Sequence, residues 1–390
     1  MRYLLLRLKR FCGFIAGFVF FIAGIFKLLD PMGSGLVVKE YMDFLHVGFM
    51  SGLAKPLAFI LAFFETLIGT ALITGIWRRF TALAALAFQT FFTVLTLILV
   101  IFNPQMDCGC FGEVVHLTHL ETFVKNIILL ILLLAFTFPL RYLGGPKKHK
   151  YVSFGIVTAS VIVFSVYTWL NIPFVDYTAY KPAAALQAGS AFGAVEEEMY
   201  EAVFEYEKDG RIQEFALENL PDSTWNFVQT KTIMKQDDKT ISLSFYADDG
   251  IYMDTLAVKG KVMVVSIYDA DMKPAAWERV VQFVQDASQT GFRPLVLVST
   301  RPEGVEYDEL PIYISDYKTL VSMNRSNGGV TYFSDGYLVR KWSSRSIPDK
   351  GELEEILEGD ETEFIIGSTA VGSLAFQGFL LYVFAVMLLL

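Results

Sequence analysis

Residues 80–102, FTALAALAFQTFFTVLTLILVIF, contain no charged side chain. A helix of roughly 20 such residues is long enough to cross the hydrocarbon core of a bilayer. Five further runs are comparably long and apolar, over 11–29, 56–77, 120–140, 151–172 and 364–390. The chain of 390 residues, of which 54% are hydrophobic, is therefore predicted to be an integral membrane protein with six spans.

Charge is distributed unevenly along the chain. Residues 171–365 carry 34 acidic and 18 basic side chains, a net charge of −16, whereas the remainder carries a net charge of +7. A polar, acidic domain is therefore inserted between the fifth and sixth spans. Its surface would repel phosphates, which excludes nucleic acid as a partner. Membrane lipid is the expected partner of the spans.

Basic residues predict the orientation in the membrane. They gather at the N-terminus, at Arg78 and Arg79, and in the connection 141–150. Because basic connections face the cytoplasm, we expect a multi-pass protein of the bacterial inner (cytoplasmic) membrane with both termini cytoplasmic. The connection 103–119 and the domain 174–362 are then periplasmic. The first span ends in KLLDP rather than in a small-residue cleavage site, so we expect it to remain as an anchor.

The third connection, NPQMDCGCFGEVVHLTH (103–119), holds two of the three cysteines and two of the four histidines. On the oxidising side of the membrane, disulfides form and persist. A Cys108–Cys110 disulfide would close a very small ring, and a strained bridge is readily reduced, as a cycling pair requires. His116 or His119 could favour the thiolate of one cysteine. We therefore predict Cys108 and Cys110 as a redox pair, with His116 and His119 as further catalytic candidates.

Other interpretations of the cysteines remain open. The pair could form a structural bridge, or remain as two inert thiols that shape the loop. The pattern C-x-C-x5-H-x2-H offers four ligands suited to zinc or copper, but C-x-C fits tetrahedral zinc poorly, so we assign no metal ligand. Cys12 lies in the cytoplasmic half of the first span and is expected to be a small packing residue.

Polar side chains inside the predicted spans include Lys27, Glu65 and Gln89. Glu65 shares a helix face with small residues, so it is expected to point into the bundle, and ionisable groups at such depth are functional candidates. A structural hydrogen-bond acceptor is the alternative. We count Glu65 among the catalytic candidates as well. Lys27 is also expected to form a local ion pair with Asp30.

Three motifs carry a family resemblance over residues 11–143: FIAGIFKLLDP (21–31), Glu65 in ETLIGTALITGIWRR (65–79), and CGCFG (108–112). This segment resembles the DoxX-like/MauE family, which implies a four-helix membrane bundle. The MauE branch is tied to methylamine utilisation and to disulfide formation in a partner enzyme. In membrane oxidases of the DsbB and vitamin K epoxide reductase type, which also have four-helix bundles, the electron acceptor is a quinone. This similarity implies that Lys27, Glu65 and Gln89 line a quinone pocket. A fused C-terminal domain of this kind resembles versions found in Bacteroidota, where methylamine metabolism is not the expected context.

The inserted domain reads as alternating strands and helices. EAVFEYEKDGRIQEFAL (201–217) predicts a hairpin around Asp209-Gly210. GKVMVVSIYD (260–269), an amphipathic helix over 274–290 and FRPLVLVST (292–300) predict two parallel strands with a right-handed crossover. A strand at LPIYIS (310–315), a short helix over 317–324, a hairpin at 329–342 and a helix near 350–357 complete a predicted α/β sandwich.

Residues 241–357 resemble thioredoxin-like domains of the resident-reductase and peroxiredoxin type, beginning with the opening FYADDGIYMDTLAVKGKVMVVSIYDADMKPAAW (245–277). Where that family places Cys-x-x-Cys, this chain has DADMKPAAW (269–277), without cysteine. The turn that usually holds a cis-proline reads SNGGVTY (326–332). The resemblance therefore implies a redox-inactive domain that binds a periplasmic client or a partner redox protein.

These patterns predict an α-helical membrane protein with an inserted α/β thioredoxin-like domain outside the cytoplasm. Its expected parts are a DoxX/MauE-like bundle (1–145), a fifth span (146–173), a hairpin-containing linker (174–240), the thioredoxin-like domain (241–362) and a sixth span (363–390). The predicted function is periplasmic thiol–disulfide electron transfer through Cys108 and Cys110 to a quinone, which would make the chain a thiol–disulfide oxidoreductase. The alternative is a non-catalytic subunit of a larger envelope complex. A transporter is disfavoured because the chain shows no inverted repeat.

Overall fold

The computed structural model describes residues 2–104, 106, 108–138, 148–186, 200–208, 211–216, 221, 224–234, 240–302 and 310–389. The chain forms two compact units, the first from Met1–Thr178 together with Gly367–Leu390 and the second from Ala179–Ile366. The second unit is thus an insertion within the first, as the charge distribution indicated.

The first unit is helical. Its elements are α1 (Arg2–Leu29), α2 (Pro31–Phe44), the 3-10 helix η1 (Gly48–Leu53), α3 (Ala54–Thr74), α4 (Arg78–Phe102), the strand β1 (Cys110–Glu113), α5 (His119–Thr137), α6 (His149–Leu170) and, from residue 367 on, α11 (Glu361–Leu389). Within the described ranges, six helical segments are long and apolar enough to cross a membrane. The chain is therefore a membrane protein.

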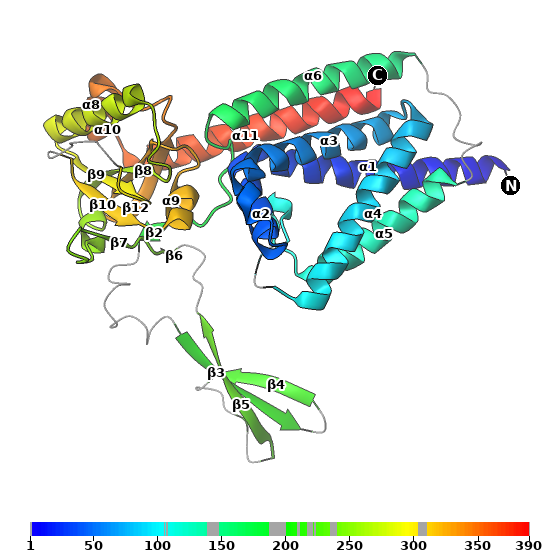
Figure 1. Cartoon of the computed structure of the whole chain (residues 1–390), viewed down its shortest axis with the longest axis horizontal. Coiled ribbons are helices and arrows are strands. Elements are labelled where there is room, and N and C mark those ends of the chain that lie inside the picture. The colour runs from blue at the N-terminus through cyan, green and yellow to red at the C-terminus, as the bar shows by residue number, and fades with distance from the viewer. Residues whose placement is uncertain are drawn as a thin grey trace. The chain divides into compact units, whose positions relative to one another are not determined.

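Helix α1 runs through the middle of this unit and packs against α3 and α5. A Cβ atom on Gly69 of α3 would lie 2.7 Å from the carbonyl oxygen of Gly17 in α1, so this glycine allows the two backbones to approach closely. A cluster of buried side chains, which includes Phe21, Val161 and Val383, joins α1 and α3 to α6 and α11. The N-terminal end of α1 and the C-terminal end of α11 lie at the same end of the bundle (Figure 1).

Helix α2 was not expected from the sequence, which was read there as a connection. Asp30 caps it, since its side chain accepts a hydrogen bond from the Gly33 N–H at 2.9 Å, and Pro31 is the first helical residue. The expected local pair of Lys27 with Asp30 is wrong. Lys27 instead pairs with Glu65 of α3, with 2.6 Å between Nζ and Oε2.

The second unit is built on an eight-stranded sheet with the order β6-β2-β12-β11-β8-β9-β10-β7. The strands are β2 (Ala185–Leu186), β6 (Thr240–Ile241), β7 (Phe245–Tyr246), β8 (Lys261–Ile267), β9 (Arg293–Val298), β10 (Ile312–Ser315), β11 (Gly329–Ser334) and β12 (Tyr337–Trp342). Strands β8 and β9 are parallel and joined through α8 (Pro274–Thr290), as predicted. Strands β11 and β12 form the predicted hairpin, and β11 pairs antiparallel with β8.

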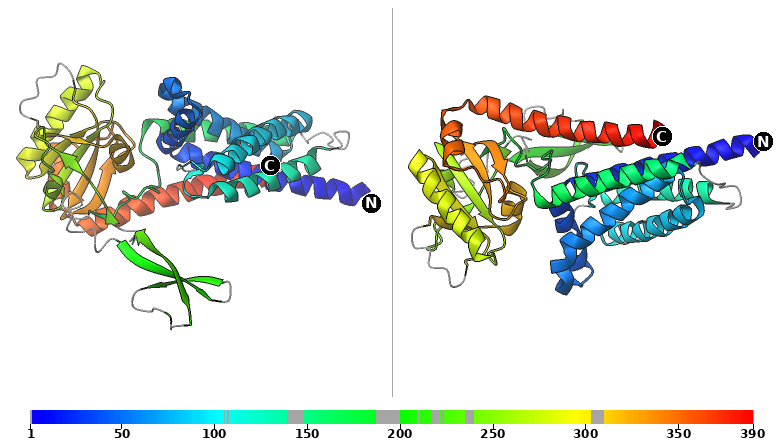
Figure 2. Two further views of the ribbon diagram at one scale, coloured as in Figure 1. Left: turned by 60° about the horizontal axis from the view of Figure 1, so that its bottom comes forward. Right: turned by 90° about the horizontal axis from the view of Figure 1, so that it is seen from above.

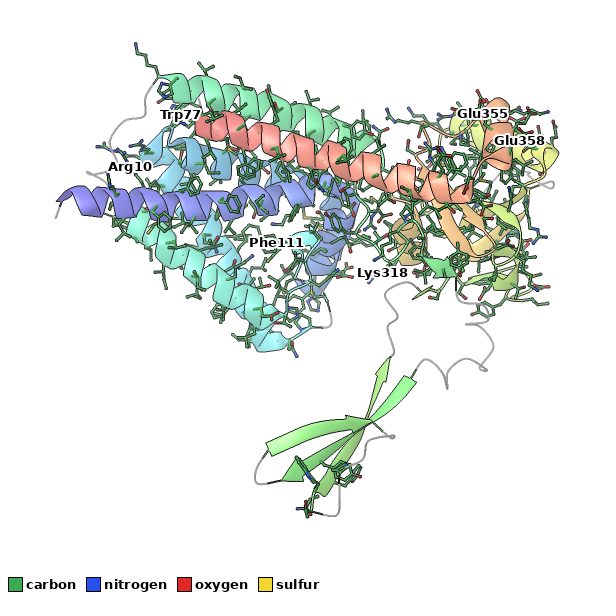
Figure 3. All side chains as sticks on the ribbon, turned by 180° about the vertical axis from the view of Figure 1, so that it is seen from behind. Arg10, Trp77, Phe111, Lys318, Glu355 and Glu358 are labelled. Carbon is green, nitrogen blue, oxygen red and sulfur yellow. The ribbon has the colours of Figure 1, made fainter. Side chains whose placement is uncertain are left out.

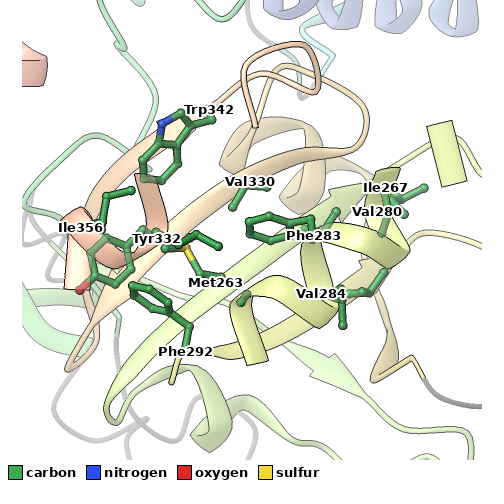
Figure 4. Packing of buried hydrophobic residues seen from close by; sticks show 14 of the residues in the cluster. Met263, Ile267, Val280, Phe283, Val284, Phe292, Val330, Tyr332, Trp342 and Ile356 are labelled. Atoms are coloured by element: carbon green, nitrogen blue, oxygen red, sulfur yellow. The ribbon is translucent and has the colours of Figure 1, made fainter. Parts of the chain in front are cut away.

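Alternating side chains of β8 divide the core between the two faces of this sheet. Met263, Val265 and Ile267 pack with α8 and α10 (Lys350–Glu358), in the cluster drawn in Figure 4. Val262 and Val264 face the other way and pack with α9 (Tyr317–Met323) and the 3-10 helix η4 (Asp254–Ala257). Figure 2 shows the sheet between these helices. This period of two is the pattern expected of a strand buried on both sides.

A separate three-stranded sheet has the order β4-β3-β5, from β3 (Tyr200–Lys208), β4 (Arg211–Ala216) and β5 (Asn226–Met234). Strands β3 and β4 pair antiparallel, with Lys208 opposite Arg211. The predicted hairpin is confirmed, although its turn residues Asp209 and Gly210 lie outside the described residues.

Candidate functional site

The connection between α4 and α5 is shaped at both of its ends. Helix α4 ends where Asn103 adopts a left-handed conformation with φ 42°. Thr118 caps α5, because its hydroxyl accepts from the Glu121 N–H while the Glu121 carboxylate accepts from the Thr118 N–H. This capping box makes His119 the first residue of α5. The side chain of His119 is thereby held at the edge of the cysteine loop.

Cys108 and His119 are in direct contact, with 2.8 Å between Sγ and Nδ1. The other ring nitrogen, Nε2, lies 2.9 Å from the carbonyl oxygen of Pro104. A carbonyl only accepts hydrogen bonds, so Nε2 carries the proton and Nδ1 is free to accept one from the thiol. Cys108 is buried, with 5% of its surface exposed. A nucleophile beside a base that a third group orients is the arrangement that activates cysteine.

Tyr41 of α2 fixes the backbone of the same residue. Its hydroxyl donates a hydrogen bond to the carbonyl oxygen of Cys108 at 2.9 Å. Burial raises the pKa of the Tyr41 phenol, and negative charge on Cys110 and Cys108 raises it further. The phenol therefore stays protonated as a donor even when the cysteines ionise.

Gly109 separates the two cysteines and turns them in different directions. It has φ 58°, and a Cβ atom there would collide with Cγ1 of Val37 in α2. Only glycine meets both conditions without strain. The next residues form β1, which contacts α1 and α2. Phe111 of β1 lies among these helices (Figure 3).

Cys110 lines a small cavity inside the bundle, of about 30 Å³. Its polar lining comprises Lys27, Glu65, Gln89, Lys125 and Asn126. Three residues proposed from the sequence as a pocket thus surround one space, together with a cysteine. All three cysteines of the chain are free thiols in the structure.

Each polar group around this cavity has a defined partner. Lys27 and Glu65 form the ion pair described above, with 17% and 12% of their side-chain surfaces exposed. The Gln89 amide donates to the carbonyl oxygen of Asn126 at 3.1 Å, and the Asn126 amide donates to the Thr96 hydroxyl at 3.2 Å. These contacts join α1 to α3 and α4 to α5. Burying them without partners would be expensive in the membrane.

His116 is placed differently from the other candidates, exposed in the loop. Across the part of the chain that the structure describes, no three His, Cys, Asp or Glu side chains converge as metal ligands would. Cys12 is buried in an apolar cluster of α1, α3, α4 and α5, as expected of a packing residue.

Sequence reasoning missed the carbonyl of Pro104, Tyr41, Lys125 and Asn126. Lys125 and Asn126 could have been found from the sequence, because they interrupt the apolar run of α5 as Glu65 interrupts that of α3. Tyr41 and the Pro104 carbonyl carried no such signal, since one lies in a helix that was read as a connection and the other is backbone.

The loop of the second unit that lacks cysteine is tied to the turn before β11. The Asn327 side-chain oxygen accepts from the N–H groups of Tyr268 and Asp269, at 2.9 and 3.1 Å, and its amide donates to the Asp269 carbonyl at 2.7 Å. Burial raises the pKa of the Tyr268 phenol. This corner of the sheet is held by hydrogen bonds and contains no sulfur nucleophile.

Comparison with known proteins finds a matching family model in each of the two units. Residues 3–139 match the model of the family described as methylamine utilisation protein MauE. Residues 200–237, which include all three strands of the smaller sheet, match a domain of unknown function, DUF8463. Protein TlpB of Flavobacterium psychrophilum is 26% identical over 151 residues, which cover 38% of this chain and 41% of that protein. The chain thus spans less than half of that relative's length. No solved structure matches.

Proposed function

We propose that Cys108 and Cys110 form a redox pair that exchanges disulfides with a protein thiol outside the cytoplasm. The observation that carries this proposal is the contact of His119 Nδ1 with Cys108 Sγ, in an imidazole whose other nitrogen is engaged by the Pro104 carbonyl. A buried thiol that only packed would have no need of an oriented base. The MauE-like segment, which contains the whole constellation, supports the same chemistry.

The exchange follows ordinary thiol–disulfide chemistry. A client thiolate attacks one sulfur of the Cys108–Cys110 disulfide, a mixed disulfide forms, and the second cysteine leaves. The second client thiolate then resolves the mixed disulfide, so that the client leaves as a disulfide and both cysteines of this chain are reduced. The two protons that the client thiols lose pass to the sulfurs of Cys108 and Cys110, and His119 Nδ1 removes the proton of Cys108 again when the pair is reoxidised. A lipid-soluble carrier must then reoxidise the pair.

In this proposal the second unit binds the client. The order β9-β8-β11-β12, with β8 and β9 parallel and β11 antiparallel to β8, supports a thioredoxin-like core. Because the loop 269–277, where such domains carry their thiols, has no cysteine in this chain, its role is docking. In this proposal the unit and the cysteine loop are periplasmic, in the inner membrane of a bacterium.

The second candidate function is a non-catalytic subunit of an envelope complex. The cysteine-free loop of the second unit favours it, because a docking domain can serve a scaffold equally well. The oriented base at Cys108 favours the redox function instead.

Trapping of mixed disulfides tests the proposal. Cys108→Ser and Cys110→Ser each remove one partner of the pair, so the remaining cysteine should hold a covalent adduct with a periplasmic protein, visible on a non-reducing gel. The control Cys12→Ser should give no adduct, and the Cys108→Ser/Cys110→Ser variant should lose it. Absence of an adduct in both single variants would refute the redox function.

A further inference from the structure

The small cavity that Cys110 lines is surrounded by more positive than negative side chains. Its charged lining consists of Lys27, Lys125 and Glu65, so two ammonium groups face one carboxylate. Lys27 and Glu65 neutralise each other, with 2.6 Å between Nζ and Oε2. The positive charge of Lys125 is therefore not neutralised by the other residues of this lining.

Among the residues that the structure describes, no carboxylate forms an ion pair with Lys125. Its ammonium instead lies 4.7 Å from the centroid of the Phe111 ring. Glu121, one helical turn earlier in α5, is engaged in the helix cap, where its carboxylate accepts hydrogen bonds from the N–H and the hydroxyl of Thr118 at 2.9 and 2.8 Å. Because ionisable groups within membrane spans normally pair with an opposite charge, a thiolate at Cys110 is the anion that suits this position.

Disulfide exchange produces such an anion. In the exchange described above, each of the two cysteines leaves once as a thiolate, because the electron pair of the broken S–S bond goes to the departing sulfur. This holds whichever sulfur the client thiolate attacks first. The Cys110 thiolate then takes up one of the two protons that the client thiols lose, so electrons and protons balance. Cys108 is in contact with His119 at this step, whereas Cys110 faces the cavity.

We propose that Lys125 is the counter-ion of the Cys110 thiolate, an inference that rests on the proposed redox function. A cavity of about 30 Å³ has room for about one or two water molecules, so the groups around it lie close together and their charges are weakly screened. Phe111 directly follows Cys110 in β1, and its contact with Lys125 holds the ammonium beside this strand.

Glu65 has the opposite effect on Cys110. Its carboxylate neutralises Lys27 and so lowers the positive charge around the thiolate. Removal of the charge of Lys125 should therefore make Cys110 less reactive, and removal of the charge of Glu65 should make it more reactive. A merely structural role of the two side chains would change the reactivity in the same direction.

The test measures the rate at which Cys110 reacts with iodoacetamide, a neutral reagent, in the full-length protein in lipid nanodiscs at pH 7. Cys12→Ser and Cys108→Ser leave Cys110 as the one remaining cysteine. In this background we expect Lys125→Met to lower the alkylation rate by about fivefold or more. Lys125→Arg, which keeps the charge, should retain most of the rate. Glu65→Gln should raise it by about fivefold.

Lys55→Met is the matched control. Lys55 also lies over an aromatic ring, 4.6 Å from the centroid of Trp169, but does not line the cavity. Its replacement should leave the rate unchanged. The thermal unfolding midpoint of each variant shows whether it is folded, and Lys125→Gln replaces Lys125→Met if the latter does not fold.

An unchanged rate in the folded Lys125→Met variant, a loss that Lys125→Arg shares in full, or a lower rate in Glu65→Gln would each overturn the assignment of Lys125. Rates that follow these charges, without any mixed disulfide in cells, would refute the redox function alone. Mixed disulfides together with rates that do not respond to these charges would refute the counter-ion alone.

Discussion

His116 and His119 are three residues apart in the sequence but lie in different environments. His119 contacts Cys108, whereas His116 is exposed. Their distances from the cysteines along the chain could not show which histidine contacts Cys108, because either could reach the cysteines in an unstructured loop. The distinction comes from the capping box of Thr118 and Glu121, which fixes the first turn of α5. That motif, T-x-x-E before an apolar run, was readable from the sequence.

Replacement of His119 should slow the reaction of Cys108. In a background of Cys12→Ser and Cys110→Ser, His119→Ala is expected to lower the rate of iodoacetamide alkylation at pH 7 by about 100-fold, the usual contribution of a positioned base. His116→Ala should leave the rate unchanged. A rate that is equal or higher in His119→Ala, at an unaltered thermal unfolding midpoint, would show that the imidazole does not activate this thiol.

The inward direction of Glu65 was predictable at this scale. The partner of Lys27 was not, because Asp30 lies on the same turn in sequence whereas Glu65 comes from a neighbouring helix. Sequence proximity favours the local pair. Asp30 instead caps α2, and Lys27 forms its ion pair with Glu65 of α3.

The Lys27–Glu65 ion pair joins helix α1 to helix α3 beside the small cavity that Cys110 lines. Lys27→Met removes one charge and leaves a carboxylate without its partner in an apolar setting. We expect it to destabilise the bundle by about 3–5 kcal/mol. The double variant Lys27→Met/Glu65→Leu should recover most of this loss, since paired apolar replacements of buried ion pairs are often neutral.

Unfolding of the detergent-solubilised protein in increasing SDS measures this difference. Equal stability of Lys27→Met and the unaltered chain would mean that water or lipid headgroups compensate the carboxylate. A double variant as unstable as the single one would show that the pair contributes more than charge neutralisation.

The elements that were predicted best from the sequence are those in which apolar residues recur with one clear period. The parallel β8–β9 pair and α8 follow directly from apolar runs and an amphipathic stretch. Helix α2 was missed although Asp30 and Pro31 are a standard N-cap and first residue. Its moderate polarity between two long spans made it resemble a connection. The short strand β1 has four residues, too few to show a period.

For the whole molecule, hydropathy and charge together indicated a membrane part and an inserted acidic part, and the contacts divide the chain at nearly the same residues. The sequence could not indicate that Lys27, Glu65 and Gln89 would enclose a cavity of only about 30 Å³. Nor could it indicate the groove of about 490 Å³ between α1 and α5. Both features depend on how α1, α4 and α5 pack, and packing is a property of side chains from distant parts of the chain.

The redox state of Cys108 and Cys110 in intact cells tests the central claim most directly. Acid trapping followed by alkylation with a mass tag, before and after a respiratory inhibitor, reports whether the pair is oxidised. We expect a mixed population that shifts toward the dithiol when the carrier pool is held reduced. A pair that stays wholly oxidised or wholly reduced under both conditions would contradict the account and make the CGC segment structural.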